Sequence, residues 1–174
     1  SDIRYTSQFE QRVGRGTTTA LDRTFRFNDQ IGAVASQFVM RNPEQVRKEI
    51  SSHASVSGPA VSLMRTADPG LALEAVLGRI QRWGQQRATA FSVYVLARYW
   101  YQLEALEGAF GGRRQSARPG ISSIRFSTVH AAKGLEADFV VIVGLEEGRN
   151  GFPADKPEDA FAEMFLPPPE AYLF

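Results

Sequence analysis

The sequence predicts an α/β fold in which helices flank a parallel sheet. Short apolar runs typical of buried strands alternate along the chain with stretches whose apolar residues recur at helical spacing. Such alternation is characteristic of parallel strands joined by right-handed helical crossovers. The 174 residues are 43% hydrophobic and 22% charged, close to globular averages, which suits one domain rather than two. We therefore expect residues 1–174 to form a single domain with a core of useful size.

The expected strands are β-prone or nearly continuous apolar runs between turn-forming residues. The run FVVIVGL is the strongest candidate for a buried strand. The expected strands cover residues 17–25, 60–65, 92–97, 123–129 and 139–145.

The expected helices are set by apolar spacing and by capping residues. Asn28 or Asp29 caps a helix that Asn42-Pro43 stops, and the turn at 68–70 leads into the next helix. The helices cover about residues 6–11, 28–42, 71–85, 99–110 and 157–165. Residues 1–16 read as an N-terminal connection, 111–120 as a surface loop and 154–174 as an acidic, proline-rich tail.

Charge is unevenly distributed although the net charge is only +1. Between Arg79 and Lys133 there are nine Lys or Arg and two acids, whereas from Glu136 onward there are nine acids and two bases. A basic middle beside an acidic tail can steer a polyanion to one face, although ordinary surface charge accounts for the same pattern.

The chain has no cysteine, which excludes disulfides and thiolate metal sites and favours a reducing compartment. His53 and His130 are the two histidines, and without cysteine we expect no metal site from them. No apolar run reaches the roughly 20 residues of a membrane span, and residues 1–12 lack the apolar core of a signal peptide. We expect a cytoplasmic protein that does not bind membranes.

Polar side chains follow several expected strands: Arg26 the first, Arg98 the third and the loop 130–136 the fourth. Functional loops of parallel α/β sheets lie at these carboxyl ends. The loop and its approach offer the Thr128 hydroxyl, the His130 imidazole, the Lys133 ammonium, a flexible Gly134 and the Glu136 carboxylate. Threonine and lysine can bind phosphate oxygens, and glutamate can accept from a ribose hydroxyl. A solvated loop with a glycine turn explains the same residues.

The segment STVHAAKGLEADFVVIVGLEEGRNGFP, residues 127–153, resembles motif V of superfamily 1 helicases of the UvrD/Rep type. The resemblance implies a RecA-like second motor domain without its own phosphate loop, in which Thr128, His130 and Lys133 contact DNA and Gly134 and Glu136 face ATP. The matching positions are Thr128, His130, Lys133, Gly134, Leu135, Glu136, Asp138, Val143, Gly144, Leu145, Glu146, Glu147, Gly148, Phe152 and Pro153.

A second block, LDRTFRFNDQIGAVASQFVMRNP, is similar to motif IV of that family. Thr24, Phe25 and Arg26 fall on its core. The resemblance implies that Phe25, where tyrosine is commoner, stacks on adenine, and that Arg26 is a catalytic residue that reaches the γ-phosphate. Read without the family, Phe25 is a core residue and Arg26 a surface residue.

A third, weaker block, VYVLARYWYQLEALEGAF, resembles the family's strand and helix that carry an arginine. Arg98, Leu106 and Glu107 are its anchors, and Arg98 contacts DNA backbone or has a structural role. Only 30 positions separate Arg98 from Thr128. Typical family members insert a large accessory domain there, so the short spacing is most similar to the bacterial helicase IV branch.

The resemblance implies ATP-dependent translocation on single-stranded DNA, 3′ to 5′ by analogy, and unwinding at duplex junctions. No G-x-x-x-x-G-K-[ST] phosphate loop occurs in the sequence. We expect that loop, and most of the Mg²⁺ ligands, in an N-terminal RecA-like domain of the same polypeptide. We also expect that the family's last motif is absent, that the segment alone is inactive, and that the protein is bacterial and associated with the nucleoid. The alternatives are a non-catalytic interaction domain, or the motor of a helicase–nuclease.

Overall fold

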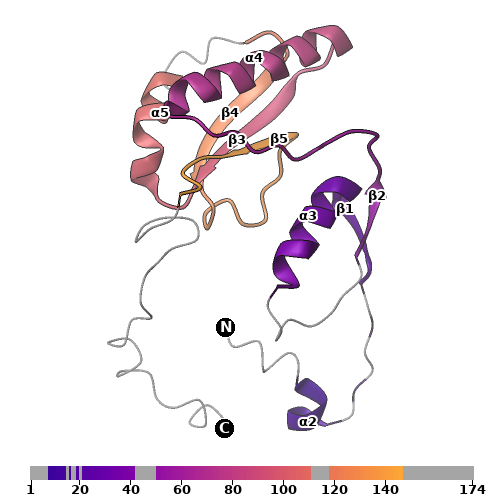
Figure 1. Cartoon of the computed structure of the whole chain (residues 1–174). Coiled ribbons are helices and arrows are strands. Elements are labelled where there is room, and N and C mark those ends of the chain that lie inside the picture. Colours follow the sequence, from indigo (N-terminus) through magenta and orange to yellow (C-terminus); the bar gives the residue numbers. More distant parts are fainter. Residues whose placement is uncertain are drawn as a thin grey trace, which may run out of the picture. The chain divides into compact units, whose positions relative to one another are not determined.

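The computed structural model describes residues 8–14, 16, 19, 21–41, 50–110 and 118–146, and Figure 1 shows the chain. The chain divides into two compact units, Ser1–Arg65 and Thr66–Phe174, and each is described by itself. Both contain parallel strands and helices, so the α/β prediction is confirmed, whereas the single domain stays a prediction. Within the described ranges, no helix has the length and apolarity that crossing a membrane requires.

The first unit contains a two-stranded parallel sheet and a helix that begins directly after its first strand. Asn28 caps this helix as predicted, because its Oδ1 accepts from the Ile31 backbone N at 3.1 Å. Asp29 then accepts from the hydroxyl of Ser55 and, at 3.1 Å, from the backbone N of Val56. These bonds tie the segment after the second strand to the start of the helix. The elements are α2 (Phe9–Val13), β1 (Arg23–Asn28), α3 (Asp29–Val39) and β2 (Ser51–Ala54).

Two predictions for this unit are wrong. Residues 60–65 form no strand and are exposed, and the pairing strand is the polar β2, whose Ser51 N donates to Asp22 O at 2.6 Å. The first strand runs Arg23–Asn28, so Arg26 lies within it and not after it. Strand formation depends on available partners more than on residue preference, and the polar segment has the partner here.

The second unit contains a three-stranded parallel sheet in the order β4-β3-β5. The helix expected over 99–110 is two elements, a short 3₁₀ turn and α5. The predicted helix 157–165, the tail 154–174 and residues 111–117 of the loop lie outside the described residues. The elements are α4 (Pro69–Arg87), β3 (Phe91–Ala97), η1 (Trp100–Gln102), α5 (Glu104–Phe110), β4 (Ile121–Thr128) and β5 (Phe139–Ile142).

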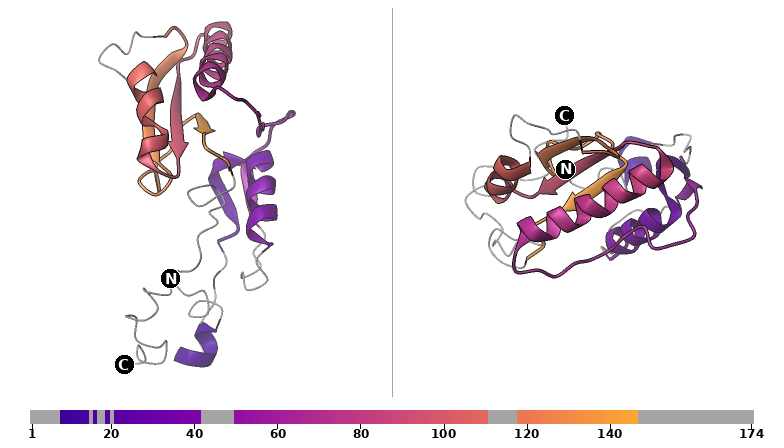
Figure 2. Two further views of the ribbon diagram at one scale, coloured as in Figure 1. Left: turned by 60° about the vertical axis from the view of Figure 1, so that its left-hand side comes forward. Right: turned by 90° about the horizontal axis from the view of Figure 1, so that it is seen from above.

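The helix α4 runs along one face of the sheet, and the core of this unit lies between them (Figure 2). β3 is its most buried strand, with both Val95 and Ala97 fully inaccessible. The prediction that 139–145 is the best buried strand is wrong, because β5 is an edge strand and Val140 is 54% exposed. The core cluster consists of Leu73, Leu77, Ile80, Val93, Val95, Ala97, Leu103, Leu106, Ile121 and Ile124.

The end of α4 approaches the start of β4 through two glycines. A Cβ placed on Gly84 would lie 2.5 Å from Gly120 Cα and 2.6 Å from Thr89 O, distances that only backbone movement could relieve. Gly120 itself has φ +83°, which favours glycine. Gly84 therefore sets how closely α4 packs on the sheet.

We expect Gly84→Ala to lower the free energy of unfolding of the chain by about 1–3 kcal/mol, because the added methyl group meets rigid backbone. Gly78→Ala is the matched control in the same helix, since the nearest atom to its Cβ is the flexible Arg82 Nη1 at 3.8 Å. The control should gain up to about 1 kcal/mol from helix propensity. Urea unfolding followed by circular dichroism measures both, and equal effects would contradict the close contact.

Candidate functional site

The carboxyl ends of β3 and β4 lie side by side. Ala97 is paired with Thr128 in the parallel register, and Val129 N donates to Ala97 O at 2.9 Å, which extends the pairing beyond the strand. Arg98 follows directly, so it and the start of the loop after Thr128 lie at one edge of the sheet, as the sequence predicts. The loop then runs back to Asp138, which is bonded to Ser92 at the opposite edge. On the other side of β3, Val143 N donates to Leu96 O at 2.9 Å.

The loop after β4 is a series of tight turns. The Thr128 hydroxyl oxygen accepts from Ala131 N at 3.2 Å and its carbonyl accepts from Ala132 N at 2.9 Å. Lys133 N then donates to His130 O at 3.3 Å. The Thr128 hydroxyl thus stabilises the turn and still has its proton to donate to another group.

The side chains of this loop that could bind a ligand are exposed. His130, Lys133 and Glu136 all lie on the surface and present an imidazole, an ammonium group and a carboxylate within seven positions. Gly134 has φ +86°, and no atom lies within 4 Å of a Cβ placed on it. The glycine is therefore required by the backbone conformation, and the space around it is open to a ligand.

In the first unit, Phe25 and Arg26 lie in an irregular part of β1. The register pairs Thr24 with Ser52 and then Asn28 with Ala54, so three residues of β1 face one of β2. Arg26 N donates to Thr24 Oγ1 at 3.3 Å, a local bond within the same strand. A bulge of this kind changes the direction in which the side chains of the strand point.

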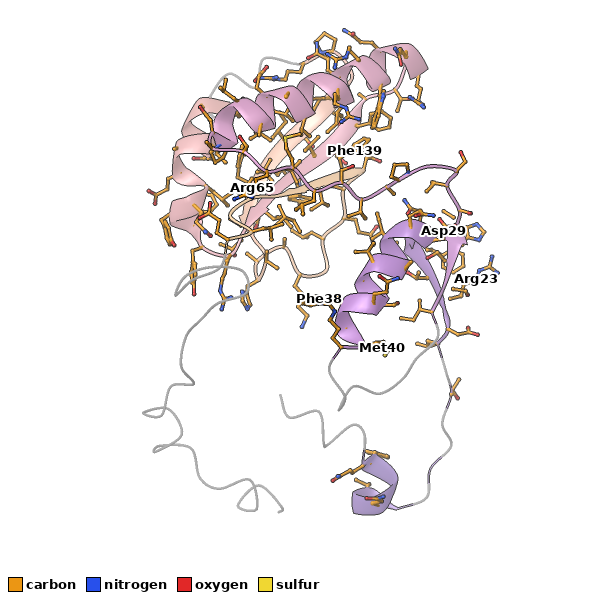
Figure 3. All side chains as sticks on the ribbon, viewed as in Figure 1. Arg23, Asp29, Phe38, Met40, Arg65 and Phe139 are labelled. Atoms are coloured by element: carbon orange, nitrogen blue, oxygen red, sulfur yellow. The ribbon has the colours of Figure 1, made fainter. Side chains whose placement is uncertain are left out.

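Phe25 is 72% exposed, so the interpretation that places it in the core is wrong. The His53 ring lies 4.9 Å from the Phe25 ring, and the Arg23 guanidinium carbon lies 5.5 Å from the Phe25 ring centre. Arg23 Nη2 donates to His53 Nδ1 at 2.7 Å, since a guanidinium has no acceptor. Figure 3 labels Arg23 in this unit. Sequence reasoning missed this cluster, because its members come from two strands that only the fold pairs.

The residues assigned to ATP by resemblance are divided between the two units. Phe25 and Arg26 belong to Ser1–Arg65, whereas Gly134 and Glu136 belong to Thr66–Phe174. The structure describes each pair in its own unit, and a shared nucleotide site stays a prediction.

Hydrogen bonds between Asp138 and Ser92 connect the start of β5 to the start of β3. The Asp138 carboxylate accepts from the Ser92 hydroxyl at 2.6 Å and from the Ser92 backbone N at 2.7 Å, and Asp138 N donates to Ser92 Oγ at 3.0 Å. The hydroxyl of Ser92, followed by its backbone N–H, lowers the pKa of Asp138 below its usual value. The adjacent Phe139, labelled in Figure 3, packs edge-on against Phe91 at 5.2 Å. The sequence match includes Asp138 but gives no sign of this role.

We expect Asp138→Asn to destabilise the chain near neutral pH, because the charge-assisted bonds to Ser92 are lost. The folded pKa is depressed, so this contribution is present above the unfolded pKa of about 3.9 and disappears as pH falls through the lower folded value. The difference between wild type and variant, measured by urea unfolding, should be largest above about pH 5 and shrink below pH 4. A difference that does not change with pH would contradict an ionised Asp138.

Comparisons with known proteins show a similarity along most of the chain. No protein-family model matches it, and no solved structure matches it. DNA helicase IV of Escherichia coli (strain K12) is 36% identical over 168 residues. This alignment covers 96% of the chain and 23% of the relative, so the chain spans about a quarter of that protein. The chain is therefore similar along almost its whole length to part of a UvrD/Rep-type DNA helicase, the family that its three motifs resemble.

Proposed function

We propose that the chain is the second RecA-like motor domain of an ATP-dependent DNA helicase that translocates 3′ to 5′ on single-stranded DNA. The observation that carries the proposal is the 36% identity to DNA helicase IV along 96% of the chain. The geometry supports it, because Arg98 and the residues directly after Thr128 lie at one sheet edge and offer groups that bind phosphate.

The proposed nucleotide contacts come from both units. Phe25 stacks on adenine and Arg26 contacts the γ-phosphate, while Gly134 lets the ligand approach and Glu136 faces the ribose or the phosphate-side network. The exposed ring of Phe25 and the bulge around Arg26 favour these roles, since both side chains lie at the surface. A guanidinium suits a terminal phosphate because it is planar, permanently charged and rich in donors.

Mg²⁺ is proposed to be held mainly by the first motor domain. The described part of this chain has no group of three or more His, Cys, Asp or Glu that could bind a metal. Mg²⁺ bound to a nucleotide needs one or two carboxylates with phosphates and waters, which fits ligands from another domain. We therefore assign no step on this chain to the metal.

The proposed DNA contacts are made by Arg98, Thr128, His130 and Lys133. Thr128, His130 and Lys133 lie within eight positions of Glu136, so one short segment connects these proposed DNA contacts to a proposed ATP contact. Loss of the γ-phosphate contact on hydrolysis would release the closed state of the two motor domains, and the loop would transmit the change to DNA. Phosphate contacts should make the binding salt-dependent.

We expect Arg26→Ala in the full-length helicase to lower the ATPase rate by about 10³-fold or more, as loss of a transition-state arginine does, while DNA affinity stays unchanged. Arg26→Lys is the control that keeps the charge and removes the planar fork, and it should recover only part of the rate. ATPase assays and DNA titrations of the same preparations separate the two effects. An equal loss of DNA binding would count against the γ-phosphate role.

A further inference from the structure

Three aromatic residues follow Arg98, which comes directly after β3, at the sheet edge to which DNA contacts are assigned. Tyr99, Trp100 and Tyr101 stand between Arg98 and Gln102. Trp100 is 44% exposed and Tyr101 is 57% exposed, whereas Tyr99 is half-buried. The resemblance gives these three residues no role, because its anchor in this segment is the arginine.

Two of the aromatic rings form a stack with the arginine. The Arg98 guanidinium carbon lies 5.5 Å from the centre of the Tyr99 ring. The Tyr99 and Tyr101 rings are 5.8 Å apart and only 14° from parallel. Arg98 and Tyr101 are thus both neighbours of the Tyr99 ring, and Tyr101 is the most exposed of the three.

Contacts of Gln102 and burial of the residue after it fix the turn that carries the two tyrosines. Gln102 Oε1 accepts from Tyr99 N at 3.0 Å, and Leu103, directly after it, is fully buried in the core. Gly144, beyond β5, has φ +71°, and a Cβ there would lie 2.6 Å from Gln102 Nε2. Close packing on both sides of Gln102 makes the turn a preformed feature, so binding would not have to order it.

We propose that Tyr99 and Tyr101 form a stacking platform for the bases of single-stranded DNA whose phosphates contact Arg98 and Lys133. The inference rests on the proposed DNA role of this edge, and adds that the edge binds bases as well as the backbone. Every base has a π face, so stacking is independent of sequence, as a motor that moves along any strand requires. The Arg98 cation beside the tyrosine pair, of which Tyr101 is exposed, favours a polyanion with aromatic groups over an apolar partner.

The test compares two labelled strands of equal length, oligo-dT and an abasic sugar–phosphate strand, by fluorescence anisotropy with the chain at low salt. Tyr101→Ala should weaken oligo-dT binding by about 5- to 150-fold, the usual effect of losing one stacked base, and leave the abasic strand unaffected. Tyr101→Phe should retain wild-type affinity, since stacking needs the ring and not the hydroxyl. Lys133→Ala should weaken both strands.

The outcomes separate this inference from the function on which it rests. Equal affinity of wild type for both strands, or no effect of Tyr101→Ala on oligo-dT, would overturn the platform while leaving the phosphate contacts standing. Failure of the chain to bind either strand would overturn the DNA role of the whole edge. Tyr101 is exposed, so Tyr101→Ala should fold normally, which circular dichroism checks.

Discussion

The two-sided pairing of β3 is the constraint on which the second unit depends. Residues 93–97 pair in parallel with β4 on one side, and 93–96 pair with β5 on the other. An apolar strand buried between two neighbours leaves little freedom of register, because a one-residue slip would turn its core side chains outward. Since all three strands are parallel, their carboxyl ends meet at one edge. The segments that begin at Arg98, at Val129 and at Val143 are thereby brought together.

Stability and proposed function are assigned to opposite ends of this sheet. At the amino end, Asp138 is bonded to Ser92, and Gly84 lets α4 approach Gly120 closely. At the carboxyl end, exposed polar and aromatic side chains lie on short turns. The loop between Thr128 and Asp138 is thus anchored at both ends, by β4 and by the Ser92 contact, and its exposed side chains lie between these two anchors.

Features that depend on neighbouring residues could be predicted from the sequence. The Asn28 cap, the strands after residues 90 and 120 and the loop carrying His130 to Glu136 follow local patterns that the fold retains. The helicase family could be predicted as well, because its motifs are long and ordered.

Features that depend on distant residues could not be predicted. The strand β2 forms because Ser51 bonds to Asp22, and Phe25 is exposed because β1 bulges opposite β2, which no periodicity reveals. Ser92 and Asp138 are 46 positions apart, and only the parallel register brings them into contact. The apolar spacing predicts a regular helix over 99–110, whereas the structure has a 3₁₀ turn followed by α5, and in the turn Tyr99 N donates to the Gln102 side chain.

The claim that one sheet edge binds DNA is tested most directly by hydrogen exchange of the chain with and without oligo-dT. The account predicts slower amide exchange in residues 98–103 and 129–136 and unchanged exchange at the opposite edge, around Phe91, Ile121 and Phe139. Protection at those three strand starts, with no change after β3 and β4, would contradict it.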